Sequence, residues 1–287
     1  MNAWQALFIG LLQGATELFP VSSLGHAVLV PGLLRWSYRQ SDPAFVPFLT
    51  LLHLGTAGAL LLLYRREWLV IVSAFVRGFL RGRFEGADER LALMLVLATV
   101  PGGLVGFVLE KALKGLFASP RLAAGALVVN GAILLGAEWL RRRSEGGEVG
   151  GEEREARFKP MSEIGARAAL LVGVAQALAL VPGISRSGVT MAGGLVAGLR
   201  HRDAAEFSFL MATPIIGAAG LLEVPKLFLD RSSSAPGLPV DLAAALLAGV
   251  AAYLSARFLV RYFRSGRLDP YGWYCAALGA FALGFLR

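Results

Sequence analysis

Residues 16–26, TELFPVSSLGH, place four chemically reactive side chains in an otherwise apolar stretch. They are a carboxylate, two hydroxyls and an imidazole, from Glu17, Ser22, Ser23 and His26. His26 lies three residues beyond Ser23, so on a helix its ring could reach the serine hydroxyl, as in an activated nucleophile. The alternative is that Ser22 or Ser23 only caps a helix that begins after Pro20.

Glu17 also pairs with Gln13, in the sequence QGATE at residues 13–17. Four residues separate the two, which places them on one helical face, one turn apart. A carboxylate and an amide carbonyl are hard oxygen ligands that suit Mg²⁺ or Ca²⁺ rather than zinc. The alternative is structural, with Gln13 packed between helices and Glu17 bonded to a backbone amide.

A second polar segment, VPGISRSGVT, occupies residues 181–190. Arg186 stands between Ser185 and Ser187, after Pro-Gly and before a predicted helix that carries Thr190. A guanidinium can bind two phosphate oxygens at once, while hydroxyls and free helix N–H groups add donors. The pattern therefore predicts an anion site, in which Arg186 pairs with a phosphate, with Glu17, or with each in turn.

The composition of the chain indicates where these groups must lie. Of its 287 residues, 56% are hydrophobic and 17% are charged, against about 25% charged in soluble domains. The mean hydropathy is +0.61, which is typical of a polytopic membrane protein. The net charge of +8 is better explained by basic cytoplasmic loops than by nucleic-acid binding. The single cysteine, Cys275, excludes an internal disulfide.

Six segments are long and apolar enough to cross a bilayer, which takes about 20 helical residues. They are residues 44–64, 91–110, 121–140, 206–225, 240–260 and 270–286. Residues 67–80 resemble an amphipathic interfacial helix. Residues 141–160 form a charged, glycine-rich stretch that we interpret as a solvated cytoplasmic linker.

Two apolar stretches, residues 3–34 and 164–199, are interrupted within the polar segments described above, from Pro20 to Gly25 and from Pro182 to Gly188. Each half is too short to span comfortably, and irregular backbone at membrane depth is tolerated only when it is buried in protein or lines a wet cavity. Both stretches therefore read as re-entrant helix-loop-helix hairpins. Without gaps, four residues of the first hairpin match four of the second: Gly10, Gln13, Ser22 and Gly25 with Gly173, Gln176, Ser185 and Gly188.

Three predicted spans follow each hairpin, so the two halves must have opposite orientations, as in an inverted repeat. The predicted fold is a single integral membrane domain, 1–287, that is all-α, with six transmembrane helices and two re-entrant hairpins. Residues 1–140 form the first repeat, 141–160 the linker and 161–287 the second repeat. The distribution of basic residues places residues 141–160 inside and the start of the first hairpin outside.

The remaining histidines are not assigned to the predicted site. His53 lies within a predicted span and is expected mainly to pack against its neighbours, with a role in lining the site as the alternative. His201 lies in the basic segment RHRD, where solvation is expected.

The two motif segments together, QGATELFPVSSLGH and PGISRSGVT, resemble the undecaprenyl-diphosphate phosphatase family, which is associated with bacitracin resistance. The resemblance covers essentially the whole chain. It implies a multi-pass enzyme of the bacterial plasma membrane that removes the terminal phosphate of a C55 polyprenyl diphosphate and so recycles the carrier lipid for cell-wall synthesis. By this resemblance, the serine–histidine and arginine motifs of the family correspond to Ser22, Ser23, His26, Ser185, Arg186, Ser187 and Thr190. The acid motif corresponds to Gln13 and Glu17. Here Gln13 replaces one of the two acids that the family motif can hold.

From these residues we expect Glu17, Ser23, His26 and Arg186 to be catalytic and Ser22, Ser185, Ser187 and Thr190 to bind phosphate. Glu17 and Gln13 are the expected ligands of a Mg²⁺ or Ca²⁺ ion. The nucleophile is left open between Ser23, His26 and a water molecule. The expected partners are a polyprenyl diphosphate lipid and membrane lipids, with no nucleic acid; a homodimer is compatible with the sequence. The active site is expected to face the outer side.

Two other functions fit parts of the pattern. Inverted repeats with broken helices are typical of transporters, so a polyprenyl-phosphate transporter or flippase is the main alternative. A phosphatidic-acid-type phosphatase is the weaker one, because only SSLGH matches it and its lysine-rich motif is missing.

Overall fold

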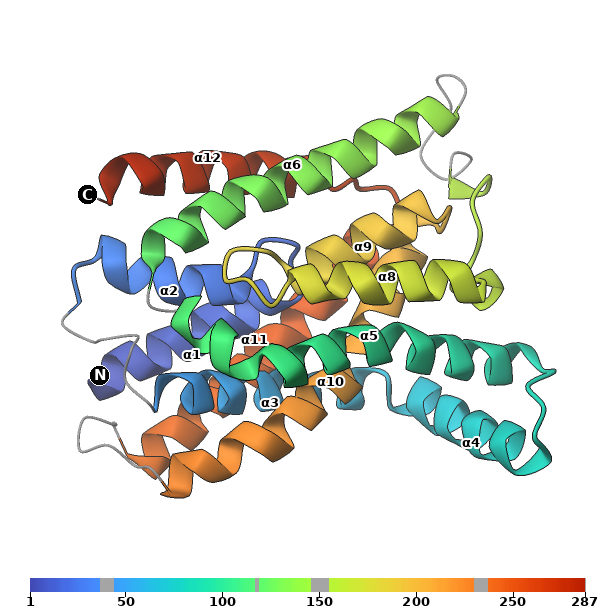
Figure 1. Cartoon of the computed structure of the whole chain (residues 1–287), viewed down its shortest axis with the longest axis horizontal. Helices are drawn as coiled ribbons and strands as arrows, with labels where there is room; N and C mark the ends of the chain where they lie inside the picture. The colour runs from blue at the N-terminus through green and yellow to red at the C-terminus, as the bar shows by residue number, and fades with distance from the viewer. Residues whose placement is uncertain (37–43, 117–118, 146–154, 230–236, 287) are drawn as a thin grey trace.

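The computed structural model describes residues 1–36, 44–116, 119–145, 155–229 and 237–286 (Figure 1). In chain order its helices are α1 (Ala3–Glu17), α2 (Ser23–Leu33), α3 (Phe45–Leu63), α4 (Arg65–Arg81), α5 (Ala87–Leu116), α6 (Pro120–Glu145), the short 3-10 helix η1 (Met161–Glu163), α8 (Ala166–Leu178), α9 (Arg186–Val196), α10 (His201–Leu229), α11 (Leu238–Tyr262) and α12 (Asp269–Phe285). A single bridge, between Lys159 and Leu199, is the only β-pairing among the described residues.

Five of the six predicted spans are helices long and apolar enough to cross a membrane: Phe45–Leu63, Ala87–Leu109, Pro120–Ser144, His201–Pro225 and Leu238–Tyr262. The sixth, predicted at 270–286, is the 17-residue helix α12. The predicted interfacial segment at 67–80 is α4, which packs against α5. The protein is thus an all-helical polytopic membrane protein in the part of the chain that the structure describes.

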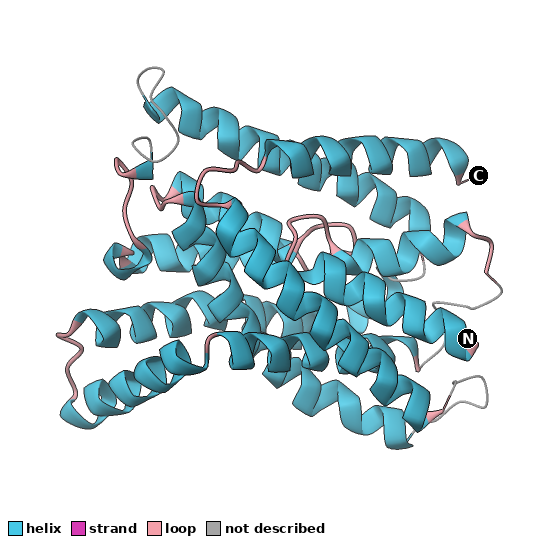
Figure 2. Cartoon of the chain, turned by 180° about the vertical axis from the view of Figure 1, so that it is seen from behind, coloured by secondary structure: helices cyan, strands magenta, loops and turns pink. Residues whose placement is uncertain are grey.

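The two predicted hairpins are each a pair of short helices joined by a loop. The first pair is α1 and α2, of 15 and 11 residues, and the second is α8 and α9, of 13 and 11 residues. α2 already begins at Ser23 and α9 at Arg186, so the helices resume earlier than the sequence suggested. Figure 2 shows their loops in the interior of the helical assembly, whereas most other loops lie at its ends.

Small residues let each hairpin pack closely on a helix of the other half of the chain. A Cβ atom on Gly10 or Gly14 of α1 would lie 2.5 or 2.0 Å from a carbonyl oxygen of α11, that of Ala244 or Ala248. A Cβ on Gly173 of α8 would lie 2.5 Å from the carbonyl oxygen of Ala98 in α5. Such glycines permit the backbone approach that drives helix association in lipid. The two hairpins are thus fixed by the same kind of contact.

The charged segment at 141–160 is not simply a solvated linker, and His201 is not solvated. Arg141, Glu155 and His201 are all buried, with 3%, 8% and 2% of their surface exposed. His201 contacts Glu155 through Nδ1 at 2.7 Å and Glu138 through Nε2 at 2.8 Å. Burial acts to raise the pKa of Glu155, but the hydrogen bonds from His201 and the charge of Arg141 lower it to about 2. Arg141 and Glu155 are buried because they form an ion pair with each other, while Arg142, Arg143 and Lys159 stay exposed. The rest of the predicted linker, 146–154, lies outside the described residues.

Candidate active site

The first hairpin presents its polar residues where α1 ends and α2 begins. Ser22 caps α2 by accepting a hydrogen bond from the Gly25 N–H at 3.1 Å, and its backbone adopts a left-handed φ of 65°. That conformation is uncommon outside glycine and marks a tightly specified turn. The Ser22 hydroxyl also accepts from the Gly183 N–H at 3.2 Å, which joins the first loop to the second.

The second hairpin repeats this construction. Ser185 caps α9 by accepting from the Gly188 N–H at 3.0 Å. Gly183, with φ of 104°, lies against α6 so closely that a Cβ would be 2.2 Å from the Ala123 carbonyl oxygen. The cap leaves Arg186 as the first residue of α9, directed toward the first hairpin.

Asn130 of α6 joins the two loops and was not anticipated from the sequence. Its side-chain oxygen accepts from the Ser185 N–H at 2.9 Å, and its amide nitrogen donates to the Pro20 carbonyl at 3.0 Å. It is fully buried. The available signal was a lone asparagine inside a predicted span, because such a residue must find polar partners in lipid.

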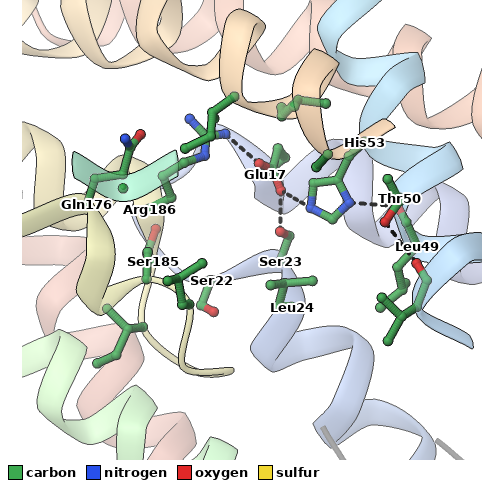
Figure 3. A pocket seen from close by; sticks show the side chains of 18 residues that line it. Glu17, Ser22, Ser23, Leu24, Leu49, Thr50, His53, Gln176, Ser185 and Arg186 are labelled. Carbon is green, nitrogen blue, oxygen red and sulfur yellow. Dashed lines mark hydrogen bonds and ion pairs between the residues drawn. The ribbon is translucent and has the colours of Figure 1, made fainter. Parts of the chain in front are cut away.

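Glu17 is the centre of the polar network (Figure 3). One carboxylate oxygen accepts from Arg186 Nη2 at 2.5 Å, and the other contacts His53 Nε2 at 3.0 Å and Gln13 Nε2 at 3.3 Å. The Ser23 hydroxyl donates to that second oxygen in a short hydrogen bond. Glu17 is only 6% exposed, and a buried charge of this kind persists because opposite charge and donors surround it.

His53 therefore belongs to the site, and its interpretation as a packing residue was wrong. Its Nδ1 lies 2.6 Å from the Leu49 carbonyl oxygen, while its Nε2 faces Glu17. Both partners are acceptors, so a ring that carries a proton on each nitrogen satisfies both contacts. α3 thus supplies a further hydrogen-bonding group beside Glu17, opposite Arg186 (Figure 3).

His26 does not reach Ser23. Its Nδ1 lies 2.7 Å from the Ser22 carbonyl oxygen and its Nε2 lies 2.8 Å from the Tyr274 hydroxyl of α12, against whose ring it also stacks. The expected proximity failed because position 26, one turn into α2, faces α12 rather than the loop. Ser23 instead bonds to Glu17.

A cavity of about 210 Å³ collects part of the predicted site. The predicted residues that line it are Glu17, Ser22, Ser23, Ser185 and Arg186. Three further polar residues complete its wall: Thr50, His53 and Gln176. The rest of the wall is apolar and includes Leu49, Leu180 and Ile216.

Four predicted residues, Gln13, His26, Ser187 and Thr190, do not line this cavity. Ser187 donates to the Phe19 carbonyl at 2.9 Å, and Thr190 contacts the Ser208 hydroxyl at 2.7 Å. In this arrangement the two hydroxyls hold the second hairpin in place.

The oxygen donors near Glu17 are of the type that a hard divalent cation uses. Glu17 is the carboxylate of the cavity, and the Gln13 side-chain oxygen lies 3.4 Å from the Thr56 hydroxyl. Among the described residues, three or more His, Cys, Asp or Glu side chains do not gather at any one point as a metal site. Mg²⁺ characteristically takes one or two carboxylates and completes its shell with substrate phosphates and water, so Glu17 is a suitable ligand. The Gln13 amide, however, turns its nitrogen toward Glu17 and its oxygen toward Thr56.

Known proteins resemble this chain along nearly its whole length. The family model described as bacitracin resistance protein BacA matches residues 6–281. The chain belongs to the BacA family. A relative named undecaprenyl-diphosphatase, from Acidiphilium cryptum, is 47% identical over 282 residues, covering 97% of this chain and 96% of the relative. One of the same name from Granulibacter bethesdensis is 47% identical over 291 residues, covering 100% and 98%. Undecaprenyl-diphosphatase 2 of Chromobacterium violaceum is 42% identical over 288 residues, covering 99% of both chains.

Proposed function

We propose that this BacA-family protein is an undecaprenyl-diphosphatase. It hydrolyses undecaprenyl diphosphate to undecaprenyl phosphate and inorganic phosphate, and so recycles the lipid carrier for cell-wall synthesis. The observation that carries the proposal is the meeting of Arg186, Glu17 and Ser23 in one cavity between the two hairpin loops. It unites an anion-binding cation, a base and a hydroxyl, which a phosphatase requires and a transporter does not.

The proposed architecture is six transmembrane helices and two re-entrant hairpins in an inverted repeat, with repeats 1–140 and 161–287 joined by residues 141–160. Reciprocal packing supports it, because α1 contacts α11 while α8 contacts α5, and α6 contacts α12. α5 is the second predicted span after the first hairpin, and α11 is the second predicted span after the second hairpin. A pseudo-twofold relation between the halves would make each hairpin pack against the second span of the other half, as these contacts do.

The proposed location is the bacterial plasma membrane, with the site open toward the outer side. The basic residues of 141–143 and 261–267 support this orientation because the positive-inside rule places them in the cytoplasm. The diphosphate then enters laterally and its prenyl tail stays in lipid. The homodimer stays a prediction.

In the proposed mechanism, the diphosphate takes over Arg186 as its counter-ion and presents its terminal phosphorus to Ser23. Glu17 accepts the Ser23 proton as the serine oxygen bonds to that phosphorus and the bond to the bridging oxygen breaks. Undecaprenyl phosphate leaves with the bonding electrons. Water then attacks the phosphoserine, orthophosphate leaves, and Ser23 regains its proton from Glu17. Direct attack by a water that Glu17 deprotonates is the alternative, and a phosphoenzyme trapped on Ser23 distinguishes the two.

We also propose that Mg²⁺ or Ca²⁺ takes part, held by Glu17 and, once its amide has rotated by half a turn, by the side-chain oxygen of Gln13. Such an ion neutralises charge on the diphosphate. Ser22 and Ser185 supply further donors at the N-termini of α2 and α9, where the positive ends of the helix dipoles favour anions.

The test is phosphate release from undecaprenyl diphosphate by the purified protein in detergent, with and without EDTA, for the wild type and Arg186→Ala. We expect metal-dependent release by the wild type and a loss of at least ~10²-fold in Arg186→Ala. If the wild type with Mg²⁺ or Ca²⁺ releases no phosphate, the enzyme proposal fails and the transporter alternative takes its place. Full activity in EDTA removes only the cation from the proposal.

A further inference from the structure

Gln176 of α8 is buried and lines the cavity, yet its amide makes no hydrogen bond. It is 2% exposed, and neither Nε2 nor Oε1 has a partner among the described residues. Native proteins satisfy nearly all buried polar groups, so an unpaired amide at a cavity wall requires an explanation. A ligand in the cavity supplies one.

The matching residue of the first hairpin is fully engaged. Gln13 donates to Glu17 at 3.3 Å and accepts from the Thr56 hydroxyl at 3.4 Å. Both glutamines come from the same position of their hairpins, so the position itself does not require an unpaired amide. The difference lies in what surrounds Gln176.

A glycine on the neighbouring helix makes room for the Gln176 amide. Gly102 of α5 also lines the cavity, and a Cβ there would lie 2.7 Å from Gln176 Nε2 and 3.2 Å from its Cγ. The next residue, Gly103, has open space around its Cβ position. Even one methyl group at 102 would displace the amide from where it now stands.

Arg186 also presents an unused donor. Its Nη2 binds Glu17, whereas Nη1 is buried with no hydrogen-bond partner among the residues described. Figure 3 shows Gln176 and Arg186 on one side of Glu17 and His53 on the other. Two unpaired donors of the same cavity therefore lie on the side away from His53.

We propose that the Gln176 amide N–H, together with Arg186 Nη1, binds the lipid-linked phosphate of the diphosphate. This inference rests on the proposed function, which puts the terminal phosphorus beside Ser23 and Glu17. The second phosphate then lies toward the Gln176 end. A neutral amide adds donors without another charge, and its oxygen accepts from water around the phosphate. Because this phosphate stays on the lipid product, Gln176 binds substrate and product alike.

The test compares Gln176→Ala, Gly102→Ala and the matched control Gly103→Ala in the purified full-length protein. Two quantities are measured: KM for undecaprenyl diphosphate and the inhibition constant of the product, undecaprenyl phosphate. We expect Gln176→Ala to raise both by roughly tenfold, as the loss of a hydrogen bond to a charged group does. Gly102→Ala should raise both in the same direction, and Gly103→Ala should leave both unchanged.

The double variant Gly102→Ala/Gln176→Ala provides the decisive comparison. If Gly102 acts by leaving room for the amide, the double variant matches Gln176→Ala; if the two effects multiply instead, the proposal is overturned. It is also overturned if Gln176→Ala changes kcat alone or leaves both constants within twofold of the wild type. Should Gln176→Ala not fold, Gly102→Ala against Gly103→Ala carries the test, because the clash at 102 involves only a flexible side chain. An active wild type with unchanged variants refutes this inference alone, whereas an inactive wild type refutes the proposed function.

Discussion

The two hairpins share a scaffold but differ at the positions that face each other. Ser22 and Ser185 make the same cap to the N–H three residues on, and Gly10 and Gly173 make the same backbone contact with the opposite half. In the same ungapped alignment Glu17 falls on Leu180 and Ser23 on Arg186. Matched positions therefore fix the shape of the hairpins, and unmatched positions supply opposite charges that meet.

The lesson of this comparison is that neither hairpin is a site by itself. The first brings a carboxylate and a hydroxyl, the second brings a guanidinium, and the ion pair between Arg186 and Glu17 joins them at 2.5 Å. In the proposed mechanism, one reaction is thus divided between two similar elements.

Removing the charge that only the first hairpin carries should have the largest effect. Glu17→Gln keeps the shape of the side chain but removes the base and leaves the half-buried Arg186 without its counter-ion. We expect phosphate release to fall by roughly 10³-fold or more, since general-base catalysis alone contributes 10²- to 10⁴-fold. The measurement is kcat/KM for undecaprenyl diphosphate, with exposed Glu67→Gln as the control. Activity within tenfold of the wild type would mean that Glu17 is not the base.

His53 lies outside both hairpins, and its substitution tests whether the comparison is complete. His53→Leu removes a donor from Glu17, while His53→Gln retains an N–H that can reach it. We expect Leu to lower kcat/KM by roughly 10- to 100-fold and Gln to restore most of the loss, given the strength of hydrogen bonds to charged groups. Equal losses in the two variants would instead indicate a packing role for the ring.

The shared caps should give the smallest effects, seen in stability. Ser22→Ala and Ser185→Ala each remove a helix cap, which costs about 0.5–2 kcal/mol. We expect both to lower Tm in detergent, Ser22→Ala more, because Ser22 also accepts from Gly183. Exposed Ser73→Ala on α4 is the control. If both cap variants unfold at the wild-type temperature, the caps are not what fixes the hairpins.

Much of the fold could be predicted because it depends on local pattern. Apolar length located the predicted spans, and Pro-Gly and Pro-Val segments located both breaks.

The site was predicted in part, because Glu17, Ser23 and Arg186 carry chemistry in their residue types alone. The partners of these residues depend on three-dimensional packing. His53 and Asn130 stand out as polar residues in apolar spans, but the sequence does not show which groups they contact. Only helix rotation decides that His26 turns toward Tyr274 while His53 turns toward Glu17. The burial of His201 could not be anticipated either, since it requires Glu138 and Glu155 to converge from distant positions.

The glycine contacts of α1 have a consequence for how the protein is made. The first hairpin leaves the ribosome more than two hundred residues before α11, the helix whose backbone receives Gly10 and Gly14. Glu17 lacks its ion-pair partner until Arg186 of α9 is made, and α1 lacks the helix that its glycines contact until α11 follows. The site is therefore completed only by the second half of the chain, and we expect a shortened product that ends before α11 to be inactive.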